Sequence, residues 1–170
     1  MKYFVFIICF IAIAFKLSAQ GLGKQLQFDG IQDYVIVQEN DYTDITGDYT
    51  IEAWVQSEIA DTMLILMKGW CAVSDYSYYL MVINGHIRWV FDSDGNCTTV
   101  NKYESSSAVI SHGECAHIAV VHTDSYVKLY KNGNPVSGAL LSGSYCPVNN
   151  SSQPLLISTY KYLSGNYGLF

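Results

Sequence analysis

The sequence predicts an all-β fold, an antiparallel β-sandwich. Short runs rich in Val, Ile, Tyr, Thr and Trp recur between turn signals about every ten residues, and almost no segment has a helical period. Several runs, such as MLILM at 63–67 and HIAVV at 117–121, are apolar at successive positions. Such runs are typical of strands covered on both faces in two packed layers, because a single exposed sheet would alternate between apolar and polar residues.

Residues 1–19 are expected to be a secretory signal outside the fold. Lys2 is followed by an almost wholly apolar run, Tyr3–Phe15, and then by KLSA, which predicts cleavage after Ala19. A membrane span needs roughly 20 apolar residues, and this run is shorter. The mature chain is therefore expected to be secreted or displayed at the cell surface, with no membrane insertion after cleavage.

Residues 24–170 are expected to form one domain, since they are numerous enough to bury a core. The chain carries 9 Lys and Arg against 15 Asp and Glu, a formal net charge of −6, and the signal removes two of the basic residues, Lys2 and Lys16. An acidic surface argues against nucleic acid or an anionic membrane as a partner. It is compatible with cations and with neutral glycans.

The expected strands are rich in β-branched and aromatic residues and are bounded by turn residues. Asn84-Gly85 predicts a two-residue type I′ hairpin, because both positions need positive φ. Asn132-Gly133 predicts a second turn of similar kind before Pro135. In chain order the expected strands are Lys24–Phe28, Tyr34–Val37, Tyr49–Gln56, Met63–Met67, Tyr78–Ile83, His86–Phe91, Cys115–His122, Val127–Lys131 and Leu155–Thr159.

Five motifs follow one another along the mature chain: LQFDGIQDYVIV at 26–37, GDYTIEAWVQ at 47–56, MKG at 67–69, YYLMVINGHIRWVF at 78–91 and AHIAVVHTDSYVKLYKNGNPV at 116–136. In order and spacing this set resembles the laminin-G-like domains of the concanavalin A-like superfamily over essentially the whole mature chain. The resemblance implies two antiparallel sheets of a jelly roll. It also implies that the strands of Trp54 and His117 lie near the centre.

The sequence departs from that family at two places. The family usually has Trp-His-His-Ile-Ala where this chain has CAHIA at 115–119, so packing near Cys115 is expected to differ. Family members continue after a segment like GNYGLF into a strand resembling Gly-x-Ile-Asp-Glu-Val-Arg-Ile-Trp, whereas this sequence stops at Phe170. The domain is therefore expected to be C-terminally incomplete, part of a larger extracellular protein, and to leave one strand with unpaired backbone groups.

Four cysteines remain after cleavage of the signal: Cys71, Cys97, Cys115 and Cys146. An even number in an exported chain suggests two disulfides, and the sequence alone allows three connectivities. We favour Cys71 with Cys97 and Cys115 with Cys146, with free thiols as the alternative. No C-x-x-C spacing occurs, which argues against a zinc site.

Asp29 is the candidate metal ligand. The resemblance implies that the aspartate of the Phe-Asp-Gly motif helps to bind a structural calcium ion, together with backbone carbonyls and an aspartate of the last strand. Calcium takes about six to eight oxygen ligands, so Asp29 alone would not hold it tightly, and the alternative is that Asp29 caps the turn at Gly30. The acidic run DSDGN at 92–96 lacks the glycine position and final glutamate of a calcium loop, which favours a polar loop.

Catalysis is not expected, although a glycoside hydrolase is the alternative. The run from Glu39 to Asp44 differs only at its last position, an aspartate, from Glu-x-Asp-x-x-Glu, which one group of hydrolases with this fold uses with carboxylates about 5 Å apart. Here the run lies in a polar loop with few apolar residues that could raise a carboxyl pKa. His117 and His122 have opposite strand parity, which predicts opposite faces of the sheet.

Trp70 and Tyr76, in the segment GWCAVSDYSYY at 69–79, are the predicted ligand-binding residues, because aromatic faces stack on sugar C–H groups. The alternative is that exported sandwiches are simply rich in tyrosine, of which this chain has 14. The sequons at 96–98, 149–151 and 150–152 would accept glycans only in a host with that machinery. The sequence therefore predicts a non-catalytic binding or adhesion module for a glycan or an extracellular protein, with a structural spacer as a further alternative.

Overall fold

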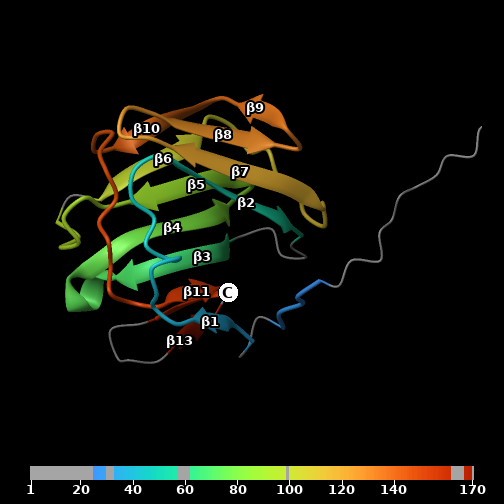
Figure 1. Cartoon of the computed structure of the whole chain (residues 1–170). Coiled ribbons are helices and arrows are strands. Elements are labelled where there is room, and N and C mark those ends of the chain that lie inside the picture. Colours follow the sequence, from blue (N-terminus) through green and yellow to red (C-terminus); the bar gives the residue numbers. More distant parts are fainter. Residues whose placement is uncertain (1–24, 30–32, 57–61, 99, 162–166, 170) are drawn as a thin grey trace, which may run out of the picture.

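The structure is a computed structural model that describes residues 25–29, 33–56, 62–98, 100–161 and 167–169. The signal peptide expected at 1–19 and the turn glycine Gly30 lie outside the described residues. Figure 1 shows a smaller sheet lying across a larger one. The larger sheet, in spatial order, contains β1 (Val35–Val37), β11 (Leu155–Ile157), β3 (Thr62–Trp70), β4 (Asp75–Ile83), β5 (His86–Phe91), β6 (Asn101–Ser105) and β10 (Gly138–Ser142).

The smaller sheet contains β2 (Tyr49–Val55), β7 (Ala116–His122), β8 (Val127–Lys131) and β9 (Asn134–Val136), in that spatial order. Two further strands, β12 (Thr159–Lys161) and β13 (Tyr167–Leu169), pair with each other, and a short 3₁₀ turn, η1 (Cys71–Val73), joins β3 to β4. Every described strand pair is antiparallel. The predicted antiparallel sandwich of jelly-roll type is confirmed.

Both predicted turns are confirmed. Asn84 and Gly85 have φ of 49° and 77°, and they join β4 to β5 where Ile83 pairs with His86. Asn132 and Gly133 have φ of 50° and 76° between β8 and β9. These positive φ values explain the sequence choice, because Asn and Gly tolerate the left-handed region best.

Two expectations about strands are wrong. Residues 25–28 form no strand, and Lys24 lies outside the described residues. The strand of Trp54, β2, lies at one edge of the smaller sheet among the described strands, while β7, the strand of His117, lies inside it. The family resemblance placed both strands near the centre, and only β7 has a described neighbour on each side.

The main core fills the space between the two sheets. Its fully buried members come from facing strands and include Ile87, Trp89, Ile118 and Leu129. The larger sheet also buries its other face, through a second cluster of Leu64, Met67, Trp70, Met81 and Leu156. Burial on both faces is the physical reason for the continuous apolar run of β3, as the sequence predicted.

Candidate functional site

The outer face of the smaller sheet carries an exposed aromatic side chain. Residues along β2 alternate between half-buried and exposed, so Thr50, Glu52 and Trp54 point away from the core. Trp54 is 71% exposed. Across the strand pair it faces His117 of β7, with the two ring centroids 5.3 Å apart and their planes at 51°. The imidazole Nε2 of His117 lies 3.5 Å from Oε2 of Glu52. We call Trp54, His117 and Glu52 the outer platform.

The outer platform combines a flat apolar ring with two polar groups on hydrogen-bonded strands. An exposed indole can stack on the C–H face of a ring ligand, and a neighbouring carboxylate and imidazole can hydrogen-bond to its hydroxyls. Sequence reasoning missed Trp54 as a site residue. The signal was present in the alternation of YTIEAWV, which places Trp54 on the same face as the charged Glu52.

Trp70 and Tyr76, the predicted ligand-binding residues, are both buried. Trp70 ends β3 and is 7% exposed, and Tyr76 lies near the start of β4 and is 2% exposed. The ring of Tyr76 packs edge-on against Tyr79, 5.9 Å away between centroids. Neither ring offers a face to a ligand at the surface, so burial removes the physical basis of that prediction. The expected strands end at Met67 and begin again at Tyr78, whereas β3 continues to Trp70 and β4 begins at Asp75, so both residues lie in strands.

A buried lysine forms ion pairs with Glu39 and Asp44, the first and last carboxylates of the run that resembles a hydrolase motif. Lys68 of β3 has no exposed surface, and its ammonium lies 2.8 Å from Oε2 of Glu39 and 2.6 Å from Oδ1 of Asp44. The ammonium also donates to the carbonyl oxygen and the hydroxyl of Thr43, at 3.1 and 3.3 Å. The side-chain amide of Asn150 donates to the second oxygen of Asp44 at 2.9 Å.

The ion pairs and hydrogen bonds of this cluster favour the ionised form of Asp44. Hydrogen bonds from Lys68 and then Asn150 hold the pKa of Asp44 well below its usual range. A carboxyl group that stays ionised cannot deliver a proton as a general acid near neutral pH. The cluster therefore provides ionic support for the segment that precedes β2.

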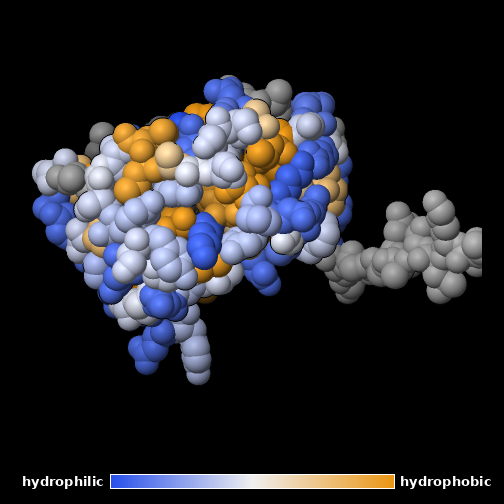
Figure 2. All heavy atoms as spheres, turned by 90° about the horizontal axis from the view of Figure 1, so that it is seen from above, coloured by the Kyte–Doolittle hydropathy of each residue, from blue (hydrophilic) through white to orange (hydrophobic). Residues whose placement is uncertain are grey.

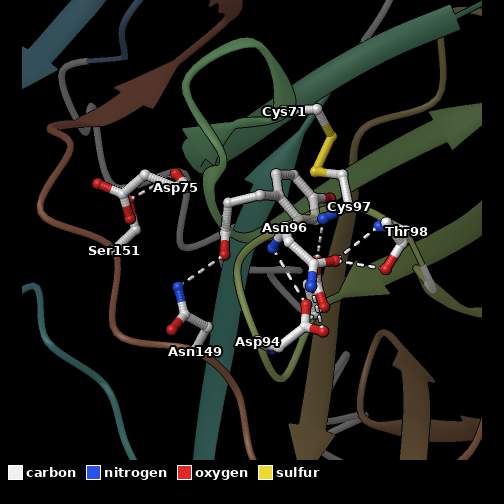
Figure 3. The surroundings of a disulfide bond; sticks show 10 residues. Cys71, Asp75, Asp94, Asn96, Cys97, Thr98, Asn149 and Ser151 are labelled. Atoms are coloured by element: carbon white, nitrogen blue, oxygen red, sulfur yellow. Dashed lines mark hydrogen bonds between the residues drawn. A yellow bond between two sulfur atoms is a disulfide. The ribbon is translucent and has the colours of Figure 1, made fainter.

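The predicted disulfide between Cys71 and Cys97 is present in the structure, with Cα atoms 5.5 Å apart. It ties η1 to the acidic loop 92–96, as Figure 3 shows. In that loop Asp92 is buried, and its carboxylate accepts the backbone N–H of Cys97 at 2.9 Å and that of Asp94 at 3.3 Å. Asp94 in turn accepts the backbone N–H of Asn96 at 3.0 Å. These carboxylates shape the loop, as expected of a polar turn.

The second predicted disulfide, between Cys115 and Cys146, does not form in the structure. Cys115 directly precedes the first residue of β7, whereas the carbonyl of Cys146 lies 3.0 Å from Nε2 of His122 at the last residue of that strand. A seven-residue strand is roughly 20 Å long, so the two thiols lie far beyond disulfide reach. Cys115 is exposed and Cys146 half-buried.

Asp29 and Asp33 are joined by two hydrogen bonds between backbone and side chain. Its backbone N–H donates to Oδ2 of Asp33, and the backbone N–H of Asp33 donates to Oδ1 of Asp29, each at 3.3 Å. The described part of the chain contains no group of three His, Cys, Asp or Glu side chains arranged to hold a metal ion. The turn at Gly30 lies outside the described residues, and calcium binding at Asp29 stays a prediction.

The predicted opposite orientation of His117 and His122 is confirmed. His117 belongs to the outer platform, while His122 is fully buried between the sheets. The parity rule holds because β7 pairs without a bulge along its whole length. Only His117 is placed to meet a ligand from the outside.

Comparison with known families and structures identifies this fold. A laminin-G-type family model, described as the concanavalin A-like lectin/glucanases superfamily, matches residues 29–167. No curated protein matches the sequence. Among the described residues there is also no helix long and apolar enough to cross a membrane.

Three solved structures share the fold at low sequence identity. Domains LG4-5 of the mouse laminin alpha1 chain align with a TM-score of 0.53 and 13% identity over 74% of this chain and 31% of that one. The protein HCR/D-Sa-GBL1/C aligns with a TM-score of 0.55 and 12% identity, covering 79% and 34%. A variant of HCR/D aligns with a TM-score of 0.53 and 16% identity, covering 74% and 32%.

The chain spans about a third of the length of each of these solved chains, and at these identities the likeness concerns the fold alone. The family model, in contrast, covers most of the sequence, including the hairpin at Asn84-Gly85, the strand of Trp54 and the strand of His117. The chain belongs to the laminin-G-like family of the concanavalin A-like lectin/glucanases superfamily.

Proposed function

We propose that this chain is an exported, non-catalytic binding module that holds a carbohydrate on the outer platform of its smaller sheet. The observation that carries the proposal is Trp54, which is 71% exposed and held against His117 on two paired strands. An indole face left in water gains free energy when a sugar ring covers it. The platform is held by backbone hydrogen bonds, which limits the entropy lost when a ligand binds.

The charges around the platform favour a neutral glycan. Glu52 has a side chain that is 65% exposed, and the chain carries a formal net charge of −6. A carboxylate accepts hydrogen bonds from sugar hydroxyls but repels sulfate and carboxylate groups. The superfamily name includes lectins and glucanases, whose common property is recognition of carbohydrate.

The proposal of binding without catalysis rests on the state of the acidic residues. Glu39 and Asp44 both face the ammonium of Lys68, which keeps Asp44 ionised. Glu52 lies on the open outer face of the smaller sheet, and its ionic contact is with the imidazole of His117. A spacer role, the other alternative, does not require an indole held beside an imidazole and a carboxylate on one open sheet face.

A glycan array tests this function directly. The intact chain is expected to bind a subset of neutral oligosaccharides, and Trp54→Ala is expected to weaken that binding by about tenfold or more. Tyr42→Ala is the matched control, because Tyr42 is 96% exposed but lies in the turn 41–43, apart from the platform. Equal binding by Trp54→Ala and the unaltered protein would contradict the proposed site.

A second measurement separates binding from hydrolysis. Any glycan that binds is incubated with the protein, and released reducing ends are quantified. We expect no release above a buffer control. Release that disappears in Asp44→Asn would instead establish a hydrolase.

A further inference from the structure

A second aromatic side chain lies on the same outer face as the outer platform. Along β8, Val127 and Leu129 belong to the core, so the alternation of the strand points Tyr130 outward. Tyr130 is half-buried, and its register partner on β9, Pro135, is exposed. In the smaller sheet β7 lies between β2 and β8 (Figure 1), so Trp54 and Tyr130 lie on opposite sides of β7.

The strand register places the two rings on a diagonal across the sheet. Glu52 of β2, Ala119 of β7 and Tyr130 of β8 form one row, because Ala119 is the register partner of both others. Trp54 lies two residues along β2 from Glu52, on the same face. Adjacent strands are about 4.8 Å apart and each residue advances about 3.4 Å, so the backbone positions of Trp54 and Tyr130 are roughly 12 Å apart. A single sugar ring does not span this separation, whereas a short oligosaccharide does.

Ala119 is the low point of the face between the two rings. Its neighbours Ile118 and Val120 belong to the core, so its methyl group points outward, yet Ala119 is only 7% exposed. A side chain this small is covered on an outer face when larger side chains rise around it. Those on the same face are Glu52 and Tyr130 across the strands and His117 and Val121 along β7. A ligand that crosses from Trp54 to Tyr130 therefore passes over a methyl group and meets no bulky side chain in between.

The polar groups of the face suit a neutral ligand rich in hydroxyls. The carboxylate of Glu52 accepts hydrogen bonds, and the phenol of Tyr130 both donates and accepts them. The outward side chains of β2, β7 and β8 include one carboxylate and one ammonium, those of Glu52 and Lys128. The ammonium of Lys128 lies over the ring of Tyr126, 4.7 Å from its centroid. These opposite charges favour neither an anionic nor a cationic polymer.

The hydropathy of the surface is also mixed. Figure 2, which shows the molecule from the side of β9, has apolar patches bordered by hydrophilic side chains. A sugar chain presents the same mixture, with apolar C–H faces and polar hydroxyl groups.

We infer that the carbohydrate ligand is a neutral oligosaccharide of more than one sugar unit, which stacks one unit on Trp54, passes over Ala119 and stacks another unit on Tyr130. Tyr130, with Pro135 beside it, is a second subsite that selects glycans by length. The inference rests on the proposed carbohydrate function, because it names the class of glycan that the outer platform holds. The second subsite strengthens binding only when the ligand is long enough to reach it.

Binding of neutral oligosaccharides of increasing length tests this inference on the intact chain. The probes are homologous series on one array, each from the monosaccharide to the hexasaccharide. For the unaltered protein, affinity is expected to rise with length and then to level off. Tyr130→Ala is expected to weaken the longer members by about tenfold and to leave the shortest unchanged, whereas Trp54→Ala weakens every length.

Three further variants separate stacking from general damage to the fold. Tyr130→Phe retains the ring and is expected to keep the affinity for long members within about threefold. Ala119→Val raises the low point with a residue that suits a strand, and it is expected to weaken the longer members as Tyr130→Ala does. Tyr145→Ala removes a tyrosine that is 38% exposed beside Tyr103 of β6, in the larger sheet, and it is expected to change no affinity.

The possible outcomes distinguish this inference from the proposed function. If the unaltered protein binds no neutral glycan of any length, both are overturned. Binding that Trp54→Ala abolishes, but that depends neither on length nor on Tyr130→Ala, would overturn the second subsite and leave the outer platform in place. Equal losses in Tyr130→Ala and Tyr145→Ala would also overturn the second subsite, because the loss would not depend on the outer face.

Discussion

The indole N–H of Trp89 donates a hydrogen bond of 3.0 Å to Nδ1 of His122 in the interior of the sandwich, where neither side chain has exposed surface. Nδ1 is therefore the acceptor, and Nε2 carries the proton and donates to the carbonyl of Cys146 at 3.0 Å. The bond joins β5 to β7 and so links the two sheets. The ring of Tyr49 stacks on the imidazole, with centroids 5.1 Å apart.

This arrangement predicts that stability falls in mild acid. Burial is the main cause that lowers the pKa of His122 below its ordinary 6.5 in the folded chain. In the unfolded chain the imidazole titrates near 6.5, so the unfolded state binds more protons as the pH falls through that value. The contribution of His122 to stability is therefore complete above about pH 7 and is lost progressively below about 6.5.

Urea unfolding between about pH 7.5 and 5.5 measures this loss. The free energy of unfolding is expected to fall over that range, by at most about 1.4 kcal/mol, the limit that one imidazole titrating near 6.5 in the unfolded chain sets at pH 5.5. His122→Gln is expected to be less stable at every pH, with a flatter profile. An equally steep profile in His122→Gln would assign the pH dependence to other groups.

The environment of the Tyr49 hydroxyl predicts that removing this group does not reduce the stability of the protein. The hydroxyl is buried, and no hydrogen-bond partner for it exists in the described part of the chain. A buried hydroxyl without a partner has lost its hydrogen bonds to water and gained none in the protein. Tyr49→Phe is therefore expected to leave stability unchanged or raise it by up to about 1 kcal/mol. Trp89→Phe is the contrast, since it leaves Nδ1 of His122 unpaired and is expected to cost about 2 kcal/mol or more. Chemical denaturation of both variants checks this, and a marked loss in Tyr49→Phe would reveal a partner for the hydroxyl.

The ion-pair cluster around Lys68 predicts an asymmetric response to substitution. The ammonium is fully buried, while the side chains of Glu39 and Asp44 are 31% and 26% exposed. Lys68→Met leaves carboxylates that water can reach, but Glu39→Gln with Asp44→Asn leaves a buried ammonium without a counter-charge. We expect the double variant to lose about 3–5 kcal/mol and Lys68→Met to lose less. Thermal or chemical unfolding measures the two losses of stability. A larger loss in Lys68→Met than in the double variant would contradict the prediction.

Gly69 and Gly133 have the same φ but different surroundings, so alanine substitutions at the two sites differ mainly in the steric clash of the added methyl group. Both have φ of +76°, so the conformational free energy needed to place alanine in the left-handed region is similar at the two sites. A Cβ at Gly69 would clash with the carbonyl oxygen of Asp75 and come within 2.6 Å of Oγ of Ser151, whereas at Gly133 nothing lies within 4 Å. Gly133→Ala is expected to cost about 1 kcal/mol and Gly69→Ala at least about 2 kcal/mol more. Equal losses in chemical denaturation would show that the β3–β4 turn relaxes around the added methyl group.

Local sequence signals predicted the elements whose structure depends on local chemistry. The Asn84-Gly85 hairpin follows from the positive φ that both positions require, and the continuous apolar run of β3 follows from burial on both faces. The strand β6 was missed because its inward residues include Asn101 and Ser105, whose side chains hydrogen-bond inside the fold. A polar inward row gives no hydrophobic signal in a sequence.

The sequence by itself determined the fold class, the turn positions, the opposite faces of His117 and His122, and the family. Only the tertiary structure decided which tryptophan is exposed, because periodicity assigns a side chain to a face but does not say whether another layer covers that face. Trp70 is covered and Trp54 is not. The same limit applies to Lys68, whose buried ion pairs join segments far apart in the sequence. It applies also to Cys115 and Cys146, which the register of β7 and the packing around His122 place at opposite ends of one strand.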